Sequence, residues 1–182
     1  MEGLTNYTEY LVKKKPDAKT VLLRIAVIVI WCAAVAATLI GVLMSETMRM
    51  LIMVLPVLWL FLGLLCYLIL DRTNIEYEYA IVSGYFQLDA IYGKKSRKRI
   101  CEAKISEIRF CAPANEKNAS MRDKSNFLNV VEGCSSRKSE NLYCFAYNDK
   151  ASGETLVYFD ATKKAIDCFV FYNRNATDRG SL

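Results

Sequence analysis

The chain has 182 residues, of which 53% are hydrophobic, and its formal net charge is +5. It contains no histidine, which excludes catalytic groups and metal sites that depend on an imidazole side chain. It also contains no Walker loop, no dinucleotide-binding glycine motif and no nucleophile elbow. We therefore predict a protein that is not an enzyme and that uses neither a cofactor nor a metal.

Two long uncharged runs follow a polar start. Residues 1–20 are predicted to form a cytoplasmic N-terminal segment, and residues 25–44 and 50–70 contain no charged side chain. Each run approaches the ~20 residues that a helix needs to cross a ~30 Å hydrocarbon core. A pair of buried core helices is the alternative, but two adjacent uncharged runs of this length are rare in soluble domains. We therefore predict a transmembrane helical hairpin over residues 21–72.

This hairpin is predicted to be an anchor. Its helices are placed at about residues 21–44 and 49–70, and the uncharged runs offer no charged group for an ion path or proton relay. Pro56 is expected to kink the second helix, because proline removes a backbone donor. Small residues recur at four-residue spacing in the first helix, a pattern that lets two transmembrane helices pack closely. The residues of this stripe are Ala33, Ala37 and Gly41.

The distribution of lysine and arginine predicts the orientation of the hairpin. Cytoplasmic flanks of transmembrane helices carry an excess of these residues. Arg49 is the only lysine or arginine in the linker between the two runs, whereas these residues are frequent before the first run and after the second. We therefore predict a multi-pass protein of the cell (inner) membrane with both termini in the cytoplasm. The flanking cations are Lys13, Lys14, Lys15, Lys19, Arg24, Arg72, Lys94, Lys95, Arg97, Lys98 and Arg99.

Residues 73–182 are predicted to form one small cytoplasmic domain. Residues 75–81 and 86–92 alternate between apolar and polar side chains, which is typical of half-buried strands, and a Ser-Gly pair between them indicates a hairpin turn. Glu76 and Glu78 lie on the polar face of the first of these strands and are expected to be solvated.

The remaining pattern predicts more strands and a final helix. Apolar residues recur with helical spacing over residues 162–172. Several antiparallel strands followed by one helix predict an α+β membrane protein, in which a small antiparallel β-barrel with a C-terminal helix follows the transmembrane hairpin. The later strands are expected at residues 105–111, 127–131, 142–147 and 155–159.

The order of these elements is similar to that of a known family. A membrane hairpin followed by "EYAIVSGYFQLDAIYGKKSRKRICEAKISEI" resembles the bacterial PH-like domains found behind paired transmembrane helices. Over nearly its full length the chain resembles the DUF6106 family, small membrane proteins of clostridia and related Firmicutes. This resemblance rests on "YTEYLVKKK", "GYFQLDAIYGKK", "SSRKSENLYCF" and "TLVYFDATKKAID". It implies a PH-like β-barrel behind a two-helix anchor, and it implies no reaction.

The stretch "GKKSRKR" (residues 93–99) is expected at the tip of the hairpin between the second and third strands. One interpretation is contact with anionic lipid headgroups, to which each cation near the surface contributes ~1 kcal/mol. The other is a solvated tip whose cations prevent edge-to-edge aggregation. A nucleic-acid site is not expected, because the rest of the domain is slightly acidic. The candidate headgroup contacts are Lys94, Lys95, Arg97, Lys98 and Arg99, with Lys13, Lys14 and Lys15 beside the first helix.

These patterns together predict a membrane-anchored cytoplasmic binding or scaffolding module. Its partners would be the lipid bilayer, anionic lipid headgroups and a protein partner, and not nucleic acid. The alternative is an accessory subunit of a larger membrane complex, in which the transmembrane hairpin makes the essential contacts.

Overall fold

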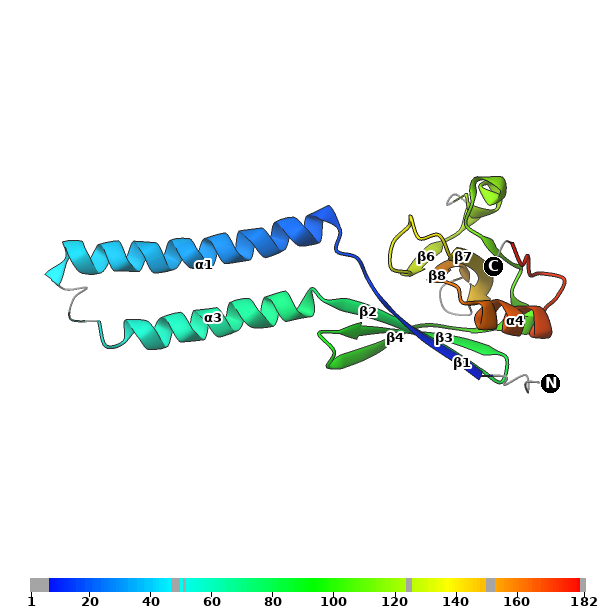
Figure 1. The fold of residues 1–182 in the computed structure, drawn as a ribbon, viewed down its shortest axis with the longest axis horizontal. Coiled ribbons are helices and arrows are strands. Elements are labelled where there is room, and N and C mark those ends of the chain that lie inside the picture. The colour runs from blue at the N-terminus through cyan, green and yellow to red at the C-terminus, as the bar shows by residue number, and fades with distance from the viewer. Residues whose placement is uncertain (1–6, 47–49, 51, 124–125, 150–152, 181–182) are drawn as a thin grey trace. The chain divides into compact units, whose positions relative to one another are not determined.

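The computed structural model describes residues 7–46, 50, 52–123, 126–149 and 153–180 (Figure 1). The chain divides into two units. The first comprises Met1–Lys15 together with Ile75–Leu182, and the second comprises Pro16–Asn74. The second unit is therefore an insertion, because the chain leaves the first unit after Lys15 and returns to it at Ile75.

The inserted unit contains two helices, α1 (Ala18–Met44) and α3 (Leu55–Arg72). Both are long and apolar enough to cross a membrane, judged by length and composition. None of the side chains of α1 is buried, and in α3 only Leu55 is. The two helices contact each other through a hydrogen bond from Trp59 Nε1 to Thr38 Oγ1, at 3.0 Å.

Some details of the predicted hairpin differ in the structure. The predicted start of the second helix at residue 49 lies outside the described residues. The expected kink at Pro56 is wrong, because α3 begins at Leu55 and the proline occupies its first turn, where a missing N–H breaks no helical hydrogen bond. Ala33 and Ala37 are exposed and Gly41 is half-buried, so their role in helix packing stays a prediction.

Sheet A contains four antiparallel strands in the order β1-β2-β3-β4. Its first strand, β1, was not predicted from the sequence. It pairs with β2, although the helical unit lies between the two strands in the chain. In β1, Thr8 and Val12 are buried, and the other side chains of the strand, including Tyr10 on the same face, are exposed. The strands are β1 (Tyr7–Lys13), β2 (Ile75–Val82), β3 (Tyr85–Tyr92) and β4 (Ser96–Lys104).

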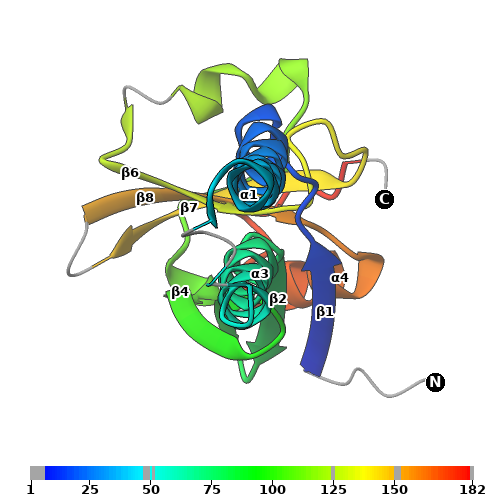
Figure 2. The same cartoon turned by 90° about the vertical axis from the view of Figure 1, so that its left-hand side faces the viewer.

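Sheet B has the order β5-β7-β8-β6, and its β6–β8 pair is parallel. Figure 2 shows β6, β8 and β7 next to one another. The described strands thus form two sheets, not the expected closed and wholly antiparallel barrel. The reason is local, because the 3-10 helix η1 (Ile105–Glu107) ends sheet A where a strand was predicted at residues 105–111. The next strand then pairs with β7 and not with β4. The strands are β5 (Phe110–Pro113), β6 (Asn129–Gly133), β7 (Leu142–Asp149) and β8 (Gly153–Asp160).

The main core lies between the inner faces of both sheets and helix α4 (Lys163–Tyr172), which confirms the predicted C-terminal helix. Thr162 caps this helix, because its hydroxyl accepts a hydrogen bond from the backbone N–H of Ala165 at 3.2 Å. The centre of the core is aromatic. The Phe86 ring of sheet A lies 4.9 Å from the Phe145 ring of sheet B, measured between centroids.

A second apolar cluster occupies the outer face of sheet B. Its buried members include Cys144, Leu156 and Tyr158, and the partly buried Phe110 and Phe127 pack against it. Between β5 and β6 the chain forms two short 3-10 helices, η2 (Glu116–Asn118) and η3 (Ser120–Arg122), where the sequence indicated only a loop.

Candidate functional site

The predicted cations of residues 13–15 and 94–95 lie at the same end of sheet A. Lys13 is paired with Glu76 at the end of β1, and Tyr92 is paired with Ile75 at the same end of β2. The turn from β3 to β4 follows Tyr92 directly. We call this set the basic end of sheet A. It consists of Lys13, Lys14, Lys15, Lys94 and Lys95.

The turn that carries Lys94 and Lys95 is tight. Gly93 and Lys94 have φ values of 55° and 58°, which lie in the left-handed region. The backbone N–H of Lys95 donates to the carbonyl of Tyr92 at 3.1 Å. The backbone at Lys94 is thus strained for a residue with a side chain, and a closed turn holds it.

The basic end of sheet A is also the end from which the chain enters and leaves the helical unit. Lys15 precedes Pro16, the first residue of that unit, and Ile75 follows Asn74, its last. The backbone N–H of Lys14 donates to the carbonyl of Ile75 at 3.0 Å, so the β1–β2 ladder brings the two points of attachment together. Lys13, Lys14 and Lys15 therefore precede the helical unit directly, and the turn with Lys94 and Lys95 follows the strand next to β2, which leads out of that unit.

Three of the predicted contacts, Arg97, Lys98 and Arg99, lie within β4 and not at the hairpin tip. Arg97 pairs with Glu78 and also lies 3.8 Å from the Asp89 carboxylate. Arg99 pairs with Asp89 at 2.5 Å and with Glu102 at 2.9 Å. Both arginines thus neutralise carboxylates of their own sheet. Lys98, between them, is exposed.

The carboxylates that pair with these arginines are buried, although Glu78 was expected to be solvated. Glu78 is 8% exposed, not solvated, and it lies directly across from Asp89, which is also 8% exposed. Like charges directly opposite each other on neighbouring strands are destabilising unless they are compensated. The pKa of Glu78 is raised, first by a hydrogen bond with the Glu9 carboxyl group and then by burial. The same hydrogen bond is the main cause of a lowered pKa at Glu9.

The buried thiols of the domain are not suited to nucleophilic chemistry. Burial raises the pKa of Cys101 to about 12, and the pKa values of Cys134 and Cys144 to about 11. A thiol must ionise to act as a nucleophile or metal ligand. These cysteines therefore act as small apolar core residues.

Comparison with known proteins places this arrangement in a family. A family model described as a bacterial PH-like domain, DUF6106, matches residues 5–177. The chain belongs to this family. The resemblance inferred from the sequence is thereby confirmed, and the match includes β1 and the inserted helical unit as well as the two sheets and α4. No curated protein and no solved structure matches the chain.

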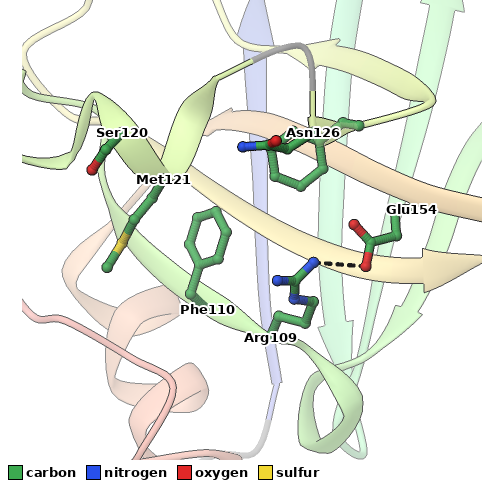
Figure 3. A pocket seen from close by; sticks show the side chains of 7 residues that line it. Arg109, Phe110, Ser120, Met121, Asn126 and Glu154 are labelled. Carbon is green, nitrogen blue, oxygen red and sulfur yellow. Dashed lines mark hydrogen bonds and ion pairs between the residues drawn. The ribbon is translucent and has the colours of Figure 1, made fainter.

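The PH-like domain also contains a concave site that the sequence did not reveal. A cleft of about 640 Å³ lies on the outer face of sheet B, between Arg109 and Phe110 at the start of β5 and residues that follow β5 in the chain (Figure 3). The residues that line the cleft come from four separate parts of the chain, so no single stretch of sequence has a pattern that would predict it. β1, in contrast, could have been recognised from the β-branched and aromatic residues of "YTEYLVK".

Proposed function

We propose that the protein is a membrane-anchored binding or scaffolding module, whose helical unit spans the bilayer and whose PH-like domain touches anionic lipid headgroups. One observation carries this proposal. The basic end of sheet A is the end from which both chain connections lead into the apolar helices.

The dimensions of the helical unit support its place in a bilayer. Helices of 27 and 18 residues extend about 40 Å and 27 Å at 1.5 Å per residue. The hydrocarbon core that they would cross is ~30 Å thick. Arg24 lies in the first turns of α1 and donates to Thr73 Oγ1 at 2.8 Å and Asn74 Oδ1 at 3.0 Å. These polar contacts would lie at the level of the headgroups.

The electrostatic contribution of the basic end is modest and depends on salt. A cation near the surface contributes ~1 kcal/mol, before screening by salt reduces it. Arg97 and Arg99 add less than the sequence suggested, because their charges are neutralised by Glu78, Asp89 and Glu102. Since the helices already hold the domain at the surface, the lysines would orient it there.

The proposed orientation places both termini in the cytoplasm. The excess of lysine and arginine at the basic end of sheet A supports it, because such an excess favours the cytoplasmic side. The cytoplasmic leaflet is also the one that carries most anionic lipid. A protein partner would then be bound by surfaces of the PH-like domain that face away from the bilayer.

A second candidate function is that of an accessory subunit, acting through its helices. The observation that favours it is the exposure of Ala33 and Ala37 on α1. Small residues on an exposed face let another transmembrane helix approach closely. Exchange of the helical unit for an unrelated hairpin would abolish this function and would spare lipid contact by the basic end of sheet A.

The proposal is tested on the full-length chain reconstituted into liposomes with either neutral or partly anionic lipid. Hydrogen exchange of residues 93–96 is expected to be slower with anionic lipid at low salt, and this protection is expected to disappear at high salt. The double variant K94Q/K95Q should lose the protection. The matched control is K163Q/K164Q, which removes two exposed lysines of α4.

Two results would contradict the proposal. Extraction of the protein from membranes by alkaline carbonate would show that the helices do not span the bilayer. Equal exchange of residues 93–96 in neutral and anionic liposomes would show that the basic end of sheet A does not contact headgroups.

A further inference from the structure

The cleft on the outer face of sheet B combines an apolar floor with an ion pair. Figure 3 shows the Phe110 ring between Met121 on one side and the Arg109–Glu154 pair on the other. The volume of about 640 Å³ lies within the ~300–1,000 Å³ that is usual for small-molecule sites. This site is separate from the basic end of sheet A and does not depend on the proposed membrane contact.

The apolar part of the cleft is an incompletely covered end of the second core cluster. Cys144 and Leu156 in this cluster are fully buried, whereas Phe110 and Phe127 are only half-buried. The two rings lie 6.4 Å apart between centroids and are inclined by 60°. Met121, from η3, is exposed beside them and is a flexible side chain that adapts to different apolar shapes. A ligand with a large apolar group would complete this cluster.

The polar part of the cleft carries one positive and one negative charge. Arg109 Nη1 lies 2.6 Å from Glu154 Oε1, and Ser120 and Asn126 also line the cleft. A simple anion would be attracted by Arg109 and repelled by Glu154, and a simple cation would meet the reverse. A molecule with a carboxylate and an ammonium group on the same carbon can pair its carboxylate with the arginine and its ammonium with the glutamate. The ion pair thus favours a zwitterion over either singly charged group.

We propose that this cleft binds a small zwitterion with a large apolar side group, which is the chemistry of an apolar α-amino acid. The α-carboxylate pairs with Arg109, the α-ammonium pairs with Glu154, and the side group packs against Phe110, Phe127 and Met121. Asn126 and Ser120 provide further hydrogen-bonding groups at the rim.

Binding is measured on the full-length chain in neutral-lipid nanodiscs by isothermal titration calorimetry. The probes are L-phenylalanine, 3-phenylpropanoate, which lacks the ammonium group, and 2-phenylethylamine, which lacks the carboxylate. L-Alanine has both charges without the large side group. We expect saturable binding of L-phenylalanine and at least tenfold weaker binding of the other three probes.

The variant E154Q tests the charge argument directly. It should weaken binding of L-phenylalanine at least fivefold and strengthen binding of 3-phenylpropanoate, because the repelling carboxylate is gone. The matched control is E107Q, which removes the partner of Lys104 in another exposed ion pair, 3.0 Å long, outside the cleft. This control should leave the binding of every probe unchanged.

Three outcomes would overturn the proposal. The first is the absence of saturable binding by any probe, which is also the result expected if the cleft accepts only a side chain of a protein partner. The second is equal binding of L-phenylalanine and its two singly charged analogues. The third is an equal effect of E107Q and E154Q.

Discussion

The backbone N–H of Lys14 is hydrogen-bonded to the carbonyl of Ile75, although the whole helical unit lies between these two residues in the sequence. This contact closes the β1–β2 ladder at the point where the helices are inserted. The PH-like domain is therefore completed by residues that precede the helices, and it cannot be separated from them by a single cut.

A fragment of residues 73–182 is expected to fold poorly because it lacks β1. It loses the buried Val12 and leaves the edge of β2 unpaired, which exposes a template for aggregation. A fusion that joins residues 7–15 to 75–182 through a short glycine-serine linker should be monomeric and unfold cooperatively. Light scattering after size exclusion and chemical denaturation measure the difference. Equal behaviour of the two proteins would show that β1 is dispensable.

Gly133 is predicted to tolerate no side chain. A Cβ atom at this position would lie 2.5 Å from Leu88 Cδ2, where sheet B meets sheet A. Overpacking of this kind destabilises a protein by about 1–3 kcal/mol, so G133A should lower the free energy of unfolding by this amount. The same substitution in an L88A background should cost less, because the clashing atoms are absent. Additive effects in urea denaturation would refute this contact.

Arg99 is predicted to stabilise sheet A by compensating Asp89. The R99M variant leaves that carboxylate, which is 8% exposed, without its closest cation and should lower the free energy of unfolding by about 1–3 kcal/mol. The double variant R99M/D89N should recover part of this loss. Lys98 is exposed next to it in β4, and K98M should change the stability by less than about 0.5 kcal/mol. Equal losses in R99M and K98M would contradict this role.

The raised pKa of Glu78 predicts a dependence of stability on pH. Its folded-state pKa lies above its ordinary value of 4.5, so the folded state binds more protons than the unfolded state as this group titrates. Its contribution is present below pH 4.5 and is lost as the pH rises through the folded-state pKa. Glu9, with its lowered pKa, acts in the opposite direction and loses its contribution as the pH falls.

The E78Q variant separates these two contributions. Glutamine stays neutral and can still donate a hydrogen bond to Glu9, so E78Q should become more stable relative to the unmodified protein as the pH rises from 4 to 7. Denaturation across this range measures the change. Glu102, an exposed partner of Arg99, provides the control variant E102Q. A difference that shrinks with rising pH would show that Glu78 is stabilised in its charged form.

The buried cysteines are predicted to resist alkylation in the folded protein. With its pKa raised to about 12, Cys101 is almost wholly protonated at pH 8, and it is 5% exposed. Iodoacetamide should therefore label it slowly in native protein and fully in denaturant, as read by mass spectrometry. Cys144, whose pKa is about 11, should behave in the same way. Rapid labelling of either residue in native protein would contradict its assignment to the core.

The sequence by itself determined the elements whose pattern is local. The uncharged runs around α1 and α3, the alternation of residues 75–81 and 86–92, and the helical spacing before Tyr172 each recur within one element. Such periodicity reports which side of an element is buried without reference to its neighbours. For this reason the two apolar helices, most strands and α4 were predictable, whereas the family was recognised by the resemblance of its motifs.

Only the tertiary structure decided what depends on residues far apart in the chain. Strand β1 has its partner beyond the helical unit, β6 runs parallel to β8, and the sheets stay separate because η1 interrupts the chain between them. The positive charge of "GKKSRKR" could be read from the sequence. That Arg97 and Arg99 pair with the buried carboxylates of Glu78 and Asp89 depends on the register of β2, β3 and β4. Side-chain pairs between strands depend on the register of the strands, and this register cannot be read from the composition of the chain.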